Sequence, residues 1–565
     1  MRNVKNLFGM AVMATALVAC SSSDDLTPNG NEGNQTGAAY ASFRINLPTT
    51  SGTRADDPKP GTPSFDEGTA KEYEVKNGTI LIFDNDGKYV TSAKLGTMNP
   101  WTDVKSDGVT TAAIATVQLT GVKVGGEYKA LVLLNNDVDE LTHKVKVTLP
   151  ETGVSYADWS KNASNVSVDN YTKTDYIFMA NAPKYDATSE PTTLVKVNNI
   201  CASREEAQAK AATTVYVERG LAKVTMQDYK TGGYTIADGT TYAGDKVVIT
   251  DWKLDVTNKS TFPVHQTDGL KNAWGGIWGE DRFADATNKS FKRVYWGIDP
   301  NYSGSALKNL TACQAAFNMI KNSEVEGQTG TDHPQYCLEN TFDLANMMQG
   351  QTTRVVFKAV YTPKALEGTT EKTFYKIGNN TAIWTKANLE QQIHTVAVTA
   401  MGITTTAEQA KYVVKLDATE NNISGEAGQH LIKAENITYT GDAADNKVDQ
   451  KVVNTINEKL GLSADAGIAT YLNGEAYYIA RIKHFNELTP WTAGTPYNGD
   501  NKAFLGRYGV LRNNWYDLSV NSISGLGYPE VPEVKPTVPD DENNQYINVE
   551  VKILSWAKRS QSIYL

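Results

Sequence analysis

The stretch "AAIATVQLTGVKVGGEYKALVLLN" (residues 112–135) holds two apolar runs that are separated by a glycine-containing turn. Short apolar runs that are bounded by glycine predict strands. Similar runs lie on either side, in "TILIFDNDGKYVTSAKL" (79–95), "TLVKVNNI" (193–200) and "TTVYVERGLAKVTM" (213–226). In residues 79–95 the "DNDG" run marks the turn of a hairpin. This density of short strands is typical of a β-sandwich.

The second half of the chain repeats the strand pattern and adds helix-like pieces. Strands are predicted in residues 246–260, 352–363, 475–485 and 508–524, and helices within 306–322, 385–398 and 448–462. A soft domain boundary falls in the stretch rich in Gly, Thr and Asp at 228–246. The expected fold class is therefore all-β, with a few short helices in the second domain.

Length and composition narrow the function classes. A chain of 565 residues is expected to divide into more than one domain. The net charge of −10 argues against nucleic acid as a partner, because nucleic-acid binding needs basic surfaces. Four cysteines are too few for a disulfide scaffold.

The first twenty residues indicate export. Arg2 and Lys5 precede the apolar run "LFGMAVMATALVA", which is too short to span a bilayer and ends in "LVAC". This looks like a bacterial lipoprotein signal, in which residues 1–20 hold the leader and Cys20 becomes an acylated, palmitate-type anchor. The alternative is an ordinary signal peptide with an accidental cysteine. The following "SSSDD" resembles the tag that directs lipoproteins to the outer face of the outer membrane.

Two isolated strands lie near the ends of the exported chain. In the first, "YASFRINLP", the apolar residues Ala41, Phe43, Ile45 and Leu47 alternate with polar ones. In the second, "INVEVKI", the apolar residues are Ile547, Val549, Val551 and Ile553. The prolines at 529, 532, 536 and 539 precede the second strand, and they predict a stiff, extended linker.

An exposed arginine between the first strand and the first long domain indicates processing. Arg54 lies in the polar, Pro- and Gly-containing segment "TTSGTRADDPKPGTP" (49–63), the kind of segment that proteases cut. A cut after Arg54 would separate the lipid anchor and strand 41–47 from the rest, leaving unpaired backbone beside an apolar groove. The C-terminal strand of another copy has the right pattern to refill that groove by strand donation.

The residues that could carry chemistry do not assemble into a site. "DNDG" (84–87) starts like a calcium loop but lacks the closing Glu, so a hairpin turn is favoured. The remaining cysteines are expected to be buried thiols, although a Cys313–Cys337 bridge is an alternative. Trp252, Trp296, Trp491 and Trp515 are expected in the core rather than on a sugar-binding face. The acidic pairs 56–57 and 540–541 lie in linkers and are expected to be solvated. No catalytic residue, cofactor or metal ligand is predicted.

Several strings, taken in order, resemble one family. They are "VYVERGLAKVTM", "DWKLDVTNKSTFPV", "VYWGIDPNY", "YCLENTF", "TTRVVFKAVY", "YYIARIKHF" and "LGRYGVLRNNWYDLSVNSISGLGYP", which together span roughly 213–530. They resemble the Bacteroidales fimbrillins, subunits of type V pili, in the short (minor) fimbria branch.

The resemblance implies two transthyretin-like Greek-key β-sandwich domains, at 55–235 and 236–530. It places a propeptide with the removable strand at 21–54, cleavage between Arg54 and Ala55, and a linker with the donor strand at 531–565. It implies a shaft subunit of an extracellular fimbrium that supports adhesion and biofilm. The implied partners are other copies of the chain, tip and anchor subunits, an Arg-specific protease and a surface receptor.

Two other functions are alternatives to a polymerising pilin. A monomeric surface lipoprotein that binds glycan would keep its lipid and need no cleavage. A surface hydrolase is disfavoured, because no set of acid, base or nucleophile residues is found.

Overall fold

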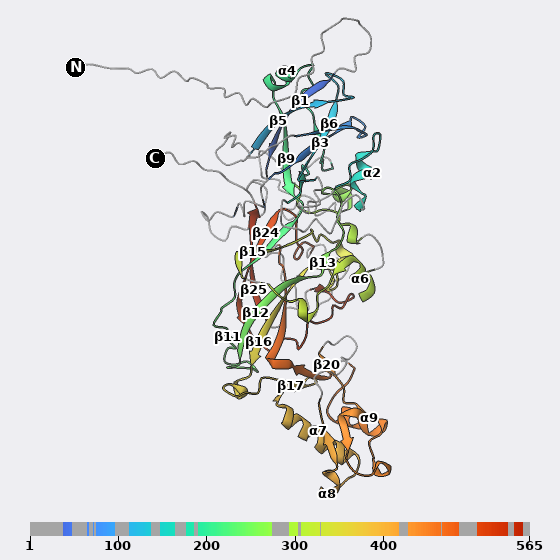
Figure 1. Ribbon diagram of the computed structural model, residues 1–565, viewed down its shortest axis with the longest axis vertical. Coiled ribbons are helices and arrows are strands. Elements are labelled where there is room, and N and C mark those ends of the chain that lie inside the picture. Colours follow the sequence, from blue (N-terminus) through green and yellow to red (C-terminus); the bar gives the residue numbers. More distant parts are fainter. Residues whose placement is uncertain are drawn as a thin grey trace, which may run out of the picture.

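The computed structural model describes most of the chain (Figure 1). The described residues are 38–47, 65–66, 72, 75–95, 112–136, 147–163, 177–185, 190–273, 293–302, 307–327, 329–416, 428–464, 466–484, 505–540 and 547–556. Cys20, Arg54, Ala55 and Trp491 lie outside them. Three parts follow one another along the long axis: an N-terminal domain, a second domain and a helical lobe.

The N-terminal domain is built on one eight-stranded sheet with the order β4-β3-β6-β7-β9-β1-β5, in which β8 also pairs with β6. Its strands are β1 (Ala39–Asn46), β3 (Gly78–Asp84), β4 (Tyr89–Lys94), β5 (Ala112–Leu119), β6 (Tyr128–Leu134), β7 (Met179–Asn181), β8 (Val195–Lys196) and β9 (Thr213–Arg219). The predicted hairpin is confirmed, because β3 pairs antiparallel with β4 across the "DNDG" turn. Asp84 Oδ1 accepts hydrogen bonds from the backbone N–H groups of Asp86 and Lys88.

Apolar alternation in these strands builds the core of the domain. The buried cluster includes Phe43, Ile80, Val132 and Val215, which come from strands far apart in sequence. Two short helices lie at the sides, α2 (Tyr156–Ser160) and α4 (Arg204–Ala209). Each begins after a serine whose side chain accepts a backbone N–H, as N-cap serines do.

The second domain packs two sheets on one core. The first has the order β15-β10-β24-β25-β2 and the second β11-β12-β16-β23. Their strands are β2 (Phe65–Asp66), β10 (Ala222–Asp228), β11 (Tyr234–Thr235), β12 (Lys246–Asp255), β15 (Gly330–Cys337), β16 (Arg354–Thr362), β23 (Glu475–Arg481), β24 (Asn514–Ile523) and β25 (Ile547–Trp556). Side chains of both sheets, among them Val224, Trp252, Phe357 and Leu518, share the core.

A smaller group of elements covers one side of the second domain. It holds α5 (Leu270–Ala273), α6 (Leu310–Ala316) and the strand pair β13 (Thr257–Asn258) with β14 (Phe317–Asn318). These elements surround a separate apolar cluster that includes Trp296, Cys313 and Phe342.

A helical lobe is inserted between β16 and β23 and forms the end opposite the N-terminal domain (Figure 1). It contains β17 (Phe374–Ile377), β18 (Ile383–Trp384), α7 (Lys386–Ala400), α8 (Thr406–Gln409), β19 (Tyr412–Val414), β20 (Gln429–His430), β21 (Ile437–Tyr439), α9 (Gln450–Lys459) and β22 (Ile468–Tyr471). Its core joins Leu389 and Ile393 of α7 to Ile456 of α9. The predicted helices within 306–322, 385–398 and 448–462 are thereby confirmed as α6, α7 and α9.

The chain passes from one domain to the other between β9 and β10. The two strands predicted within residues 213–226 are present, but β9 belongs to the N-terminal sheet and β10 to the second domain. The sheets therefore change at Gly220 and Leu221, ahead of the soft boundary at 228–246. The all-β prediction is confirmed, with helices gathered mainly in the lobe. Among the described helices, none is long and apolar enough to cross a membrane.

Candidate strand-exchange site

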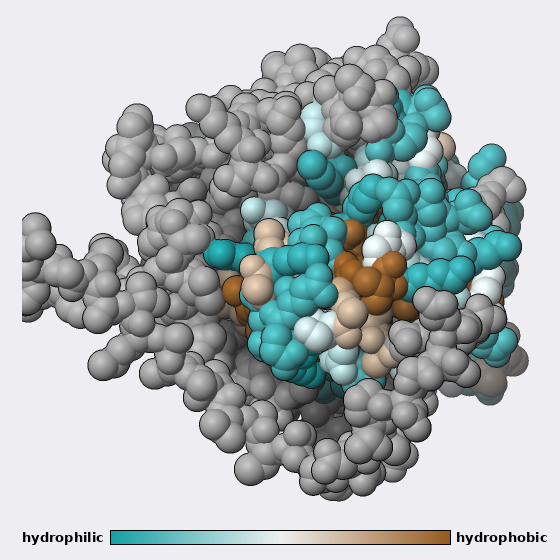
Figure 2. All heavy atoms as spheres, turned by 90° about the horizontal axis from the view of Figure 1, so that it is seen from above, coloured by the Kyte–Doolittle hydropathy of each residue, from teal (hydrophilic) through white to brown (hydrophobic). Residues whose placement is uncertain are grey.

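The first predicted strand, β1, lies inside the N-terminal sheet. It pairs antiparallel with β5 along eight residues and parallel with β9 along four. The apolar side chains of Ala41, Phe43, Ile45 and Leu47 are at most 1% exposed. Figure 2, which looks onto this end of the molecule, shows a mainly hydrophilic described surface. The strand thus fills the interior of the domain with one face.

The other face of β1 is held by polar contacts. Ser42 is buried, and its hydroxyl donates to the carbonyl of Ala207 in α4 at 2.8 Å. The same hydroxyl lies 2.8 Å from Thr116 Oγ1 of β5. Tyr40 exchanges two backbone hydrogen bonds with Cys201, both of 2.9 Å. Helix α4 therefore covers this face of β1, whereas β5 lies beside β1 in the same sheet.

Removal of β1 would open a slot between β5 and β9. Neighbouring strands lie about 4.8 Å apart, so the slot would be about 9.6 Å wide, the width that one new strand fills. Burial of Phe43, Ile45 and Leu47 contributes roughly 1.5–3 kcal/mol each. An empty slot is thus costly, because it exposes this apolar surface together with two rows of unpaired backbone groups.

The second predicted strand, β25, lies at its own second domain in this structure. It pairs antiparallel with β24 along nine residue pairs, with Val549 opposite Val520 and Val551 opposite Leu518. Val549 is half-buried against the core. On the other side of β25, two residues of β2 pair with Ser555 and Trp556. Strand β25 therefore has one full partner strand and one short one.

The proline-containing segment before β25 lies against the domain. We call residues 528–540 the strap. Tyr528 exchanges two backbone hydrogen bonds of 2.7 Å with Tyr477 of β23. The carbonyl of Pro532 accepts a hydrogen bond from Arg354 Nη2 at 2.8 Å. Val534 is buried in the apolar cluster around Trp296 and Cys313.

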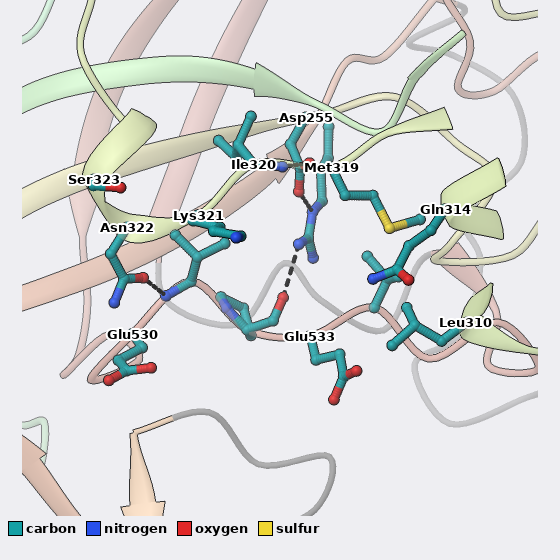
Figure 3. A pocket seen from close by; sticks show the side chains of 14 residues that line it. Asp255, Leu310, Gln314, Met319, Ile320, Lys321, Asn322, Ser323, Glu530 and Glu533 are labelled. Atoms are coloured by element: carbon teal, nitrogen blue, oxygen red, sulfur yellow. Dashed lines mark hydrogen bonds and ion pairs between the residues drawn. The ribbon is translucent and has the colours of Figure 1, made fainter. Parts of the chain in front are cut away.

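Figure 3 shows the strap beside a cavity of about 440 Å³. Asn322, on the opposite wall, accepts a hydrogen bond from the backbone N–H of Val531 at 2.7 Å. Asp255 accepts from Arg354 Nε at 2.7 Å, so it holds the guanidinium that binds the strap. Glu530 and Glu533 lie on the strap itself.

The strap ends at a buried aspartate. Asp540 is 1% exposed. The expectation that the acidic pair 540–541 is solvated is therefore wrong for Asp540. Its Oδ2 accepts from Thr352 Oγ1 at 2.9 Å, and its carbonyl accepts from Arg481 Nε at 3.2 Å. Hydrogen bonds make the burial tolerable. The burial of Asp540 could not be predicted from the sequence, because its partners Thr352 and Arg481 lie far from it along the chain.

Buried charges hold the segment that follows the predicted cleavage site. Glu72 is completely buried; its Oε1 lies 2.9 Å from Lys223 Nζ, and its carbonyl accepts from Arg219 Nε. Lys223 also lies over the ring of Trp515. Burial, and then the charge of Glu72, raises the pKa of the Tyr336 hydroxyl, which donates to Glu72. Glu72 is thereby fixed at the junction of the two domains.

A second buried carboxylate, that of Glu218, links the two domains at the same junction. Glu218 of β9 pairs with Arg293 and with His265 Nδ1, the latter at 2.7 Å. Burial works to raise the pKa of Glu218, but Arg293 and His265 outweigh it and hold the pKa at about 2. A charged Glu218 therefore ties the N-terminal sheet to the second domain.

The tryptophans and cysteines singled out in the sequence are buried wherever the structure describes them. Trp252, Trp296 and Trp515 are buried, as expected for core residues. The cysteines at 201, 313 and 337 are buried and free, so no Cys313–Cys337 bridge is present. Within the described residues, no group of three or more potential metal ligands is found.

Comparison with known proteins connects the C-terminal part to fimbriae. Residues 469–562 match the family model "Major fimbrial subunit protein type IV, Fimbrillin, C-terminal". The matched stretch contains β23, β24, the strap and β25. No curated protein matches the chain.

Solved structures give weaker likenesses. A proposed cell adhesion protein of Parabacteroides distasonis ATCC 8503 is 13% identical over 92% of this chain and 99% of its own, with a TM-score of 0.39. A fimbrial assembly protein of the same strain is 13% identical over 61% and 93%, with a TM-score of 0.24. A proposed adhesin of Bacteroides ovatus is 9% identical over 56% and 72%, with a TM-score of 0.23. TM-scores at this level carry no argument about function.

Proposed function

We propose that this chain is a structural subunit of a cell-surface fimbrium that polymerises by strand exchange. The observation that carries the proposal is a complete interior strand, β1, upstream of the arginine at the predicted cleavage site. The family match of residues 469–562 supports a fimbrial role for the part that bears the donor strand.

In the proposed sequence of events, Cys20 carries the lipid that brings the precursor to the outer membrane surface. An Arg-specific protease cuts between Arg54 and Ala55, and β1 leaves with the propeptide. Glu72, fixed at the domain junction, keeps the following segment in place. The strand β25 of another copy then enters the slot between β5 and β9.

The two strands match in length and pattern. β1 has eight residues and β25 has ten, and each carries four apolar side chains at alternate positions. At its own domain, β25 pairs with nine residues of β24 and two of β2, whereas the slot would offer eight residues of β5 and four of β9. The backbone pairing in the two places is therefore nearly equal. Apolar burial favours exchange, because Val549 is only half-buried at its own domain, whereas the inward side chains of β1 are at most 1% exposed in the slot.

The same proposal assigns the chain to the short (minor) fimbria branch of the fimbrillins and to the shaft of the fimbrium. It also includes contacts with tip and anchor subunits and with a surface receptor. Adhesion and biofilm formation would follow from the polymer. The role is structural, and no catalytic step is assigned to the chain.

The test is protease-triggered assembly of residues 21–565. Brief digestion with an Arg-specific protease, N-terminal mapping, gel filtration and negative-stain microscopy should show cleavage before Ala55 and then fibres. Arg54→Ala should stay monomeric. Val551→Asp should be cleaved but not assemble, because it brings a charge into an apolar slot.

A matched control for the donor strand is Val413→Asp, which places the same charge at a 37% exposed position of the lobe. This variant should form normal fibres. Fibres formed by Val551→Asp, or a wild-type protein that is cut at Arg54 and stays monomeric, would contradict the proposed assembly.

A further inference from the structure

The strap limits how far the donor strand can reach. Beyond the contacts of Tyr528, Val531, Pro532 and Val534, the backbone N–H of Gln349 donates to the carbonyl of Val538 at 2.9 Å. The strap is thus held at several points along its length, and it ends at the buried Asp540. The part of the tether between the strap and β25 is then residues 541–546.

The reach of this tether follows from backbone geometry. Seven Cα–Cα steps separate residue 540 from residue 547, and each spans at most about 3.3–3.6 Å, so Ile547 can lie at most about 25 Å from Asp540. If the whole segment from Tyr528 were free, nineteen steps would allow about 65 Å. Anchoring at Asp540 therefore reduces the reach to less than half.

The tip of the helical lobe lies beyond this reach. Asp540 binds Arg481, which pairs with Arg354 at the end of β16 and β23 that is far from the lobe. The nine residues of β16 span about 26 Å at 3.3 Å per residue, within the strand range. Because the lobe continues the long axis away from the N-terminal domain (Figure 1), its tip lies beyond the far end of β16 and therefore farther from Asp540 than the tether can reach.

A hollowed surface lies close to Asp540, where the strap is held. A cavity of about 530 Å³ is lined, among others, by Lys308, Asp343, Ala345, Met348 and Pro536. Met348 pairs with Pro539 of the strap in an isolated bridge, which places this surface beside Asp540. Met348 is half-buried, whereas Lys308 and Asp343 are exposed. An apolar centre with a charged rim is typical of protein interfaces.

We propose that this surface docks the N-terminal domain of the next copy in the fibre. The inference rests on the proposed function, because only a strand donated from a short tether requires the acceptor domain to lie here. The acceptor carries a fitting group beside its slot: Ile114 of β5, opposite Arg44 of β1, is 55% exposed. Successive subunits then overlap near Asp540, and the helical lobe stays outside the contact.

Photo-crosslinking within the assembled full chain tests the docking surface. A photoreactive amino acid replaces Ala345, on the proposed surface, or Ala407, at the tip of the lobe; both alanines are exposed. After cleavage and assembly, position 345 should give cross-linked dimers whose second site maps to the N-terminal domain. Position 407 should give none above background. Intermolecular cross-links from 407 and not from 345 would overturn the docking surface.

An engineered disulfide bond tests whether the strap stays bound near Asp540 during assembly. Met348→Cys with Pro539→Cys places a cysteine on each side of an antiparallel bridge, where Cα atoms are about 4.5–5.5 Å apart. The oxidised protein should assemble as fully as the same protein after reduction. Assembly only after reduction would mean that the strap must detach, and would overturn the short tether. Absence of fibres from wild-type protein would instead reject the strand-exchange function itself.

Discussion

Phe43→Ala tests how β1 is held in the precursor. Phe43 is fully buried in the core of the N-terminal domain, where β1 lies between β5 and β9. Replacement of a buried Phe by Ala typically costs about 3–5 kcal/mol, from lost burial and the cavity left behind. We expect the free energy of unfolding of the N-terminal domain to fall by about that amount. Urea unfolding of the uncut precursor measures it.

The same change should weaken the hold on the cut propeptide. After cleavage at Arg54, the fragment with β1 is a non-covalent ligand of the slot. A loss of about 3–5 kcal/mol raises its dissociation constant by roughly two to three and a half orders of magnitude, at 1.4 kcal/mol per factor of ten. Fluorescently labelled fragment, followed by dilution and gel filtration, reports its release.

Arg44→Ala is the matched control on the same strand. Arg44 is half-buried, on the face opposite Phe43, and its Nε donates to Asn46 Oδ1 at 3.4 Å. We expect a change of about 1 kcal/mol or less, in the range of single hydrogen bonds. Equal release of the Phe43→Ala and Arg44→Ala fragments would refute the argument that apolar burial retains β1.

Three further substitutions test the end of the strap at Asp540, the junction between the domains and the helical lobe. Asp540→Ala leaves Thr352 without its acceptor, so we expect the free energy of unfolding to fall by about 1–3 kcal/mol and the backbone amides at positions 537, 538 and 540 to exchange faster. Glu218→Gln leaves Arg293 without its carboxylate and should cost about 3–5 kcal/mol in urea unfolding. His430→Gln should remove a loss of stability in acid, measured as the melting temperature against pH.

The signs of the two pH effects follow from the pKa shifts. The pKa of Glu218 is held at about 2, so its contribution is present above its ordinary value of 4.5 and disappears as the pH falls toward 2. Burial, and then Lys433, lowers the pKa of His430 to about 4. The neutral ring is thus favoured in the folded lobe, and stability decreases as the pH falls from about 6.5 to about 4, by about 3 kcal/mol at 1.36 per unit.

Controls separate these effects from general damage. Glu533→Ala removes an exposed carboxylate from the strap and should leave amide exchange at positions 537, 538 and 540 unchanged. A Glu218→Gln protein as stable as wild type at neutral pH would show that the charge at the domain junction is dispensable. An unchanged pH profile in His430→Gln would assign the acid sensitivity of the lobe to other groups.

The sequence by itself determined the strands and their inward faces. Alternation of apolar and polar residues at 41–47 predicted β1, because successive side chains of a strand point to opposite sides. The turn at "DNDG" and the helices α7 and α9 were also predictable, since turn chemistry and helical periodicity are local. The same alternation located β25, which is described in the structure as Ile547–Trp556.

Only the tertiary structure decided which strands become neighbours. Residues 213–226 contain two strands in close succession, yet β9 and β10 belong to different sheets, because pairing depends on partners far away in sequence. For the same reason Asp540 could not be recognised as buried: its partners Thr352 and Arg481 lie 188 and 59 residues away. Local pattern thus fixes the elements, whereas long-range packing sets their neighbours and the point where the strap is held.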